Sequence, residues 1–123
     1  MKIRIHQQSV RLRLSTKDVE EFTKNGLVKE NLIFGHGQSE FGYELKISKA
    51  DAYKIRFIDS VVSIEIPKEK ADHWLNPNEV GFHFTQETGE HPIKVIIEKD
   101  FQCLVPRPDE NEELNFPNPA ANH

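Results

Sequence analysis

Lys2-Ile3-Arg4-Ile5 and Lys54-Ile55-Arg56-Phe57 are two versions of one alternating tetrapeptide, 52 positions apart. The same offset aligns residues 2–46 with residues 54–98 without a gap, and apolar positions of one segment fall on apolar positions of the other. Such self-similarity is typical of one supersecondary unit used twice. We therefore predict two repeats, residues 2–48 and 54–100, within a single domain of residues 1–105.

The pattern within each repeat predicts the order strand, strand, helix, strand, strand. Apolar and polar residues alternate in most segments, as in half-buried strands. Ser15, with Asp18 three positions later, is expected to cap the first helix, and Gly26 to end it. Pro67 suits the first turn of a second short helix.

These elements predict an α+β fold. One repeat is a poor core by itself, and most links are short, which favours antiparallel pairing. We expect a mostly antiparallel, barrel-like or strongly curled sheet with two short helices, because closure would remove exposed strand edges. An open antiparallel α+β sheet is the alternative.

Composition narrows the class of protein. The 123 residues have 37% hydrophobic and 29% charged residues, which is typical of a globular domain. No apolar run approaches the roughly 20 residues of a membrane span. The single cysteine excludes an internal disulfide, so we expect a cytoplasmic protein. The net charge of −4 argues against nucleic acid as the main partner.

The charges are unevenly distributed along the chain. Residues 106–123 form an acidic, proline-rich C-terminal tail with Asp109, Glu110, Glu112 and Glu113. By alternation, the strands place many basic residues opposite the core, against the acidic Glu44, Glu65 and Glu98. These basic residues are Lys2, Arg4, Arg11, Arg13, Lys46, Lys54, Arg56 and Lys94. Three interpretations stay open for this basic face: a solvated surface with cross-strand ion pairs, a site for phosphate or carboxylate, or a seat for the acidic tail.

Metal and nucleophile chemistry is weakly indicated. The histidines lack the spacing of metal-binding motifs, so neither a metal nor a cofactor is expected. A site built from His36, His83 and His91, with Cys103 or Glu90, is geometrically conceivable, although histidines in turns usually lie on the surface. Cys103 follows the phase of the last strand and is expected to be a buried thiol.

The C-terminal sequence supports a family resemblance. Glu98-Lys99-Asp100-Phe101-Gln102-Cys103-Leu104, then Pro106-Arg107 and the ending Asn115-Phe116-Pro117-Asn118-Pro119, follow the opening Ser9-Val10-Arg11-Leu12-Arg13-Leu14. Together they resemble a family of small uncharacterised bacterial proteins of about this length. The resemblance spans nearly the whole chain and implies a bacterial single-domain protein. It implies no activity and no catalytic residue.

The sequence leaves three functions open, and an enzyme is not the favoured one. The first is a binding module whose basic face contacts an acidic protein, a small anion or its own tail through Arg4, Arg11, Arg13, Lys54 and Arg56. The second is an enzyme or sensor for a small anionic metabolite, with Glu65 or Glu98 as acid or base. The third is a homodimer with exchanged tails. Whether the basic face lines a closed cavity would separate the first two.

Overall fold

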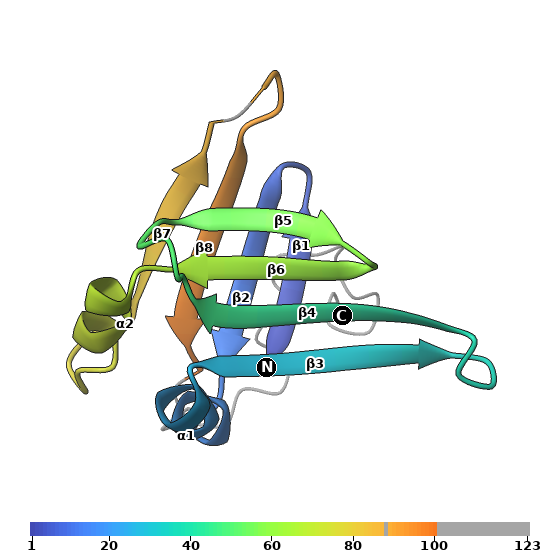
Figure 1. The fold of residues 1–123 in the computed structure, drawn as a ribbon. Coiled ribbons are helices and arrows are strands. Elements are labelled where there is room, and N and C mark those ends of the chain that lie inside the picture. Colours follow the sequence, from blue (N-terminus) through green and yellow to red (C-terminus); the bar gives the residue numbers. More distant parts are fainter. Residues whose placement is uncertain (88, 101–123) are drawn as a thin grey trace, which may run out of the picture.

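A computed structural model describes residues 1–87 and 89–100 of the chain (Figure 1). The predicted boundary at residue 105, the tail 106–123 and Cys103 lie outside the described residues. The first half contains β1 (Lys2–His6), β2 (Ser9–Leu14), α1 (Thr16–Asn25), β3 (Leu27–Phe34) and β4 (Ser39–Ile47). The second half contains β5 (Lys54–Ile58), β6 (Val61–Ile66), α2 (Lys68–Trp74), β7 (Gly81–Gln86) and β8 (Ile93–Lys99).

The order of elements follows the predicted unit. Strand, strand, helix, strand and strand occur in each half, and β5 and β6 begin and end 52 positions after β1 and β2. A duplication as the origin of this order remains a prediction.

The strands form two four-stranded sheets. The first sheet has the order β1-β2-β8-β7 and the second the order β3-β4-β6-β5, so each half of the chain contributes one strand pair to each sheet. Figure 1 shows the strands of one sheet running across those of the other, with both helices near one end of the sheets. The helical links between β2 and β3 and between β6 and β7 carry the chain from one sheet to the other.

The predicted barrel-like or strongly curled sheet is wrong, whereas the α+β class is correct. The described strands form two separate sheets, and each keeps two edge strands: β1 and β7 in the first, β3 and β5 in the second. The alternative of an open sheet is nearer, but both sheets are mixed, because β2 pairs with β8 and β4 with β6 in parallel. The prediction assumed that strands joined by short links pair with each other. Residues 48–53 join β4 to β5, but β6 lies between these two strands and pairs with β4 in parallel.

The core lies between the sheets and beneath the helices. Fully buried residues of β2, β4, β6 and β8 include Leu12, Leu45, Ile64 and Ile97. Trp74 packs edge-on against Phe22, with ring centroids 6.2 Å apart, and joins α2 to α1. The Trp74 ring also lies 5.8 Å from the Phe82 ring of β7, so it packs α2 against the first sheet.

Local sequence fixes both ends of α1. The Ser15 hydroxyl accepts a hydrogen bond from the Asp18 amide at 3.2 Å, and the Asp18 carboxylate accepts from the Ser15 amide at 2.9 Å. This reciprocal capping box satisfies amides that the first helical turn leaves without partners. Gly26 ends the helix in a left-handed conformation, with φ of 69°, which glycine adopts without steric cost.

Asp18 also binds the chain's amino group. Its Oδ2 lies 2.7 Å from the Met1 nitrogen, and Glu30 Oε1 lies 3.1 Å from the same atom. Burial raises the pKa of Asp18, but hydrogen bonds from the amino group and from Ser15 outweigh it and hold that pKa below its ordinary value. Burial lowers the pKa of the amino group, but the two carboxylates outweigh it and raise that pKa. This cluster links the start of β1 to α1 and β3.

Candidate functional site

The predicted basic face is divided between the outer surfaces of the two sheets. Strand register places Lys2 opposite Arg13 and Arg4 opposite Arg11 on the first sheet. Lys94 and Glu98 continue that surface, paired with Ser9 and Arg13. Val10 and Leu12, between these positions, are buried on the other side. Lys54, Arg56, Lys46, Glu44 and Glu65 lie on the outer surface of the second sheet.

The outer surface of the second sheet neutralises its own charges. The Arg56 guanidinium donates to the Glu65 carboxylate, which is nearly buried. Lys46 lies 3.5 Å from Glu44, which also accepts a 2.7 Å hydrogen bond from the Ser63 hydroxyl. Arg56, Lys54 and Glu65, predicted site residues, therefore form part of a network of ion pairs and strand pairs that supports the sheet.

The outer surface of the first sheet keeps a positive excess. Lys2, Arg4, Arg11 and Arg13, together called the basic patch, lie on the adjacent strands β1 and β2. Glu98 pairs with Arg13 at 3.0 Å and with Arg11 at 3.7 Å. Asp100 lies 3.5 Å from Lys2. Among the ion pairs of residues 1–87 and 89–100, none includes Arg4, although Arg4 stands directly across from Arg11. Like charges directly opposite are unfavourable, so a bound anion would stabilise this pair.

Two adjoining hollows give the basic patch a receptive shape. One is lined by Arg4, His6, Ser9 and Arg11, the other by Lys2, Ile3, Arg4, Arg11 and Arg13, and each has a volume of about 260 Å³. Arg4 and Arg11 line both hollows, so carboxylate or phosphate oxygens seated in either would meet two guanidinium groups. The sequence prediction missed Ser9 and His6, and alternation indicated only that they share this side of the sheet.

The two halves of the chain show why only one sheet keeps this excess. At the offset of 52 positions, Lys2 and Arg4 correspond to Lys54 and Arg56. Arg11 and Arg13, however, correspond to Ser63 and Glu65. On the second sheet, Lys54 and Arg56 thus stand opposite an acidic and a neutral residue, whereas on the first sheet Lys2 and Arg4 stand opposite two arginines. The difference concentrates positive charge on one surface.

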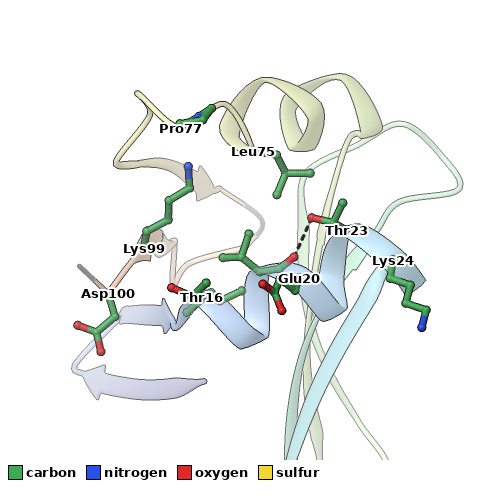
Figure 2. Close-up of a pocket in the computed structure, with 10 residues that line it drawn as sticks. Thr16, Glu20, Thr23, Lys24, Leu75, Pro77, Lys99 and Asp100 are labelled. Atoms are coloured by element: carbon green, nitrogen blue, oxygen red, sulfur yellow. Dashed lines mark hydrogen bonds between the residues drawn. The ribbon is translucent and has the colours of Figure 1, made fainter. Parts of the chain in front are cut away.

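An apolar groove is the second candidate site (Figure 2). It lies between α1, the segment after α2 and the end of β8, and has a volume of about 570 Å³. Leu14, Val19 and Leu75 line it, and Thr23 donates its hydroxyl to the Val19 carbonyl at 2.7 Å. At its rim, Lys99 donates to the Asn76 carbonyl at 2.8 Å and lies over the Trp74 ring. The groove therefore offers apolar contact, and Thr23 and Lys99 at its rim are engaged within the chain.

The structure separates the predicted acid or base residues and the histidines considered as metal ligands. Glu65 and Glu98 lie on different sheets, so they do not form one acid and base pair. His36 lies between β3 and β4, whereas His83 lies on β7 and His91 just before β8. Within the part of the chain that the structure describes, no group of three or more His, Cys, Asp or Glu side chains could hold a metal ion. None of the described helices is both long and apolar enough to cross a membrane.

The comparisons with known proteins give a family without an activity. No curated protein and no solved structure matches the chain. The model of a family of unknown function, DUF7009, matches residues 1–120. The chain belongs to this family, which confirms the resemblance to an uncharacterised family, and any function must be inferred from the residues themselves.

Proposed function

We propose that this member of a family of unknown function is a small binding module whose basic patch recognises carboxylate groups of an acidic protein segment. The observation that carries the proposal is the Arg4–Arg11 pair. Two guanidinium groups face each other across β1 and β2, and both line the two adjoining hollows. Charge-assisted hydrogen bonds to carboxylates would relieve their repulsion.

An acidic polypeptide fits this patch better than a single small anion. The four cations form two cross-strand pairs, Lys2 with Arg13 and Arg4 with Arg11, which follow one another along the strands. Side chains two positions apart in a strand are separated by roughly 7 Å, a spacing that an extended chain with acidic residues at alternate positions would match. Such contacts bring partners together quickly and weaken with salt.

The alternative of an enzyme or sensor for a small anionic metabolite is less well supported. That alternative placed the arginines inside a barrel, whereas the basic patch lies on the outer surface of an open sheet. Lys2, Arg4 and Arg13 are exposed and Arg11 is half-buried. We further propose a bacterial, cytoplasmic setting, which the single cysteine supports.

A binding titration tests the proposal. A fluorescein-labelled oligoglutamate peptide is added to the full chain, and fluorescence anisotropy is followed at low and at physiological salt. The double variant Arg4→Glu/Arg11→Glu should bind at least about tenfold more weakly, because two attractive contacts become repulsive. The control Lys17→Glu/Lys49→Glu makes the same change in net charge at exposed positions away from the patch. Equal loss in both variants would show an effect of net charge alone and would overturn the proposed site.

A further inference from the structure

The second sheet has an apolar surface that the first sheet does not cover. Leu32, Phe34, Phe41 and Phe57, together called the apolar shelf, lie on the same side of the sheet as the buried Val28, Leu45 and Ile55. Leu32, Phe34 and Phe57 are nevertheless 55%, 52% and 65% exposed. The Phe41 ring lies 6.4 Å from the Phe57 ring. Figure 1 shows the reason: the outer part of the β3–β4 hairpin extends beyond β1.

The edge strand β1 borders this shelf. Among the described strands β1 pairs with β2 alone, so its other edge presents backbone groups toward the side where the hairpin projects (Figure 1). Ile5, on the core-facing side of β1, is 57% exposed, whereas Leu12 on β2 is fully buried. On the opposite side of β1 stand Lys2 and Arg4 of the basic patch. The free edge of β1 thus has the apolar shelf on its core-facing side and the basic patch on its outer side.

The chemistry of this edge defines the segment that would fit it. An added strand would present alternate side chains to the two surfaces. Residues facing the shelf should be large and apolar, and residues facing the patch should be acidic or polar. Long exposed edges with apolar neighbours are usually covered in native proteins, because they otherwise pair with other chains.

The chain itself carries such a segment at Glu113-Leu114-Asn115-Phe116. Alternation places Leu114 and Phe116 on one side and Glu113 and Asn115 on the other, with Pro117 immediately after. Proline lacks the amide that a longer ladder would need, so it suits the end of an added strand.

The described part of the chain ends after β8, which is separated from β1 by β2 alone. The Asp100 carboxylate lies 3.5 Å from the Lys2 ammonium at the beginning of β1. Glu113 lies thirteen positions after Asp100, a length of chain that could span up to about 43 Å when extended, whereas five-residue β1 is about 17 Å long. The connecting chain is therefore long enough for the segment to reach any position along β1 of the same molecule.

We propose that residues 113–116 add to the free edge of β1 as a fifth strand, with Leu114 and Phe116 on the apolar shelf and Glu113 beside the basic patch. The inference rests on the proposed function and names the first acidic segment that the patch would take. Because the segment is tethered, its effective concentration is in the millimolar range. It would act as a built-in competitor, and an external acidic partner would have to displace it.

Paramagnetic broadening in the full chain tests this placement. Cys103, the single cysteine, is changed to serine, and a nitroxide is attached at Asn115→Cys. The label should broaden the amide signals of β1 and of the shelf residues. Adding Leu114→Ser/Phe116→Ser should remove the broadening while the other signals keep their positions. A label at Ala121→Cys serves as the control for random encounters of the tail, and its broadening should not be concentrated on β1.

The outcomes separate this inference from the proposed function. No selective broadening of β1 would overturn the inference. Broadening of β1 in isotope-labelled molecules that carry no nitroxide, when they are mixed with nitroxide-labelled ones, would also overturn it, because the occupant would then be a second copy. If oligoglutamate still binds through Arg4 and Arg11 in the first case, the proposed function stands alone. If the placement is correct, Leu114→Ser/Phe116→Ser should tighten oligoglutamate binding about tenfold, because the tethered competitor is released.

Discussion

Arg4 and Arg56 occupy equivalent positions in the two halves of the chain, yet removing each should affect the stability of the fold very differently. Arg56 donates to Glu65, whose side chain is 11% exposed. Replacing Arg56 with methionine keeps much of the apolar stem but leaves that carboxylate without its guanidinium. In Arg4→Met, a repulsive contact with Arg11 is removed.

The expected changes in the free energy of unfolding follow from the contacts of Arg56 and Arg4. A hydrogen bond to a charged group contributes about 1.5–3 kcal/mol to stability, and a partly buried charge left alone adds a desolvation cost. Arg56 is 38% exposed and Lys46 and Lys54 flank Glu65, which moderates the loss. We expect Arg56→Met to lower the free energy of unfolding by about 2 kcal/mol. Arg4→Met should change it by less than about 0.5 kcal/mol, or raise it slightly.

Urea denaturation at pH 7, followed by circular dichroism, measures both variants against the unchanged chain. In a thermal melt, the Arg56 variant should unfold roughly 10 °C lower. A loss in Arg4→Met equal to that in Arg56→Met would refute the reasoning, because Arg4 would then have a structural partner as strong as Glu65.

Two further predictions concern the framework around the site. Asp18→Asn should lower the free energy of unfolding by about 2 kcal/mol at pH 7, because it weakens the cap of α1 and the contact with the Met1 amino group. The pKa of Asp18 is lowered by folding, so its stabilisation is present above about pH 4 and is lost as pH falls through the lowered pKa. Urea titrations should therefore show a smaller difference in the free energy of unfolding between the unchanged chain and Asp18→Asn at pH 3 than at pH 7. An equal difference at both pH values would contradict this. Gly81→Ala should lower the melting temperature, because a Cβ there would lie 2.6 Å from the Ile97 carbonyl oxygen, and β7 would have to shift away from β8. An unchanged melting temperature would contradict this, because it would show that β7 can shift away from β8 without loss of stability.

The sequence predicted local structure well because local rules determine it. Alternation identified the strands, and Ser15 with Gly26 marked both ends of α1. The outer positions of β1 and β2 were also predictable, since Lys2, Arg4, Arg11 and Arg13 alternate with residues that face the core.

The arrangement of strands was not predictable from the same rules. Alternation tells which residues share a side of a strand, but not which strands share a sheet. Lys54 and Arg56 therefore seemed to belong with Arg4, whereas β5 lies in the second sheet. The apolar shelf was missed for a related reason. Leu32 and Phe57 have the phase of core residues, and only the crossing of the two sheets leaves them exposed.

The most direct test of the central claim transfers the residues of one sheet to the other. Arg11→Ser/Arg13→Glu gives β2 the residues that β6 carries at the equivalent positions, Ser63 and Glu65. Oligoglutamate anisotropy should show at least about tenfold weaker binding by this variant. A urea titration of the same variant measures its stability, because the change removes both partners of Glu98 and places a second glutamate opposite it. Affinity within about twofold of the unchanged chain would contradict the claim that the basic patch of the first sheet is the binding surface.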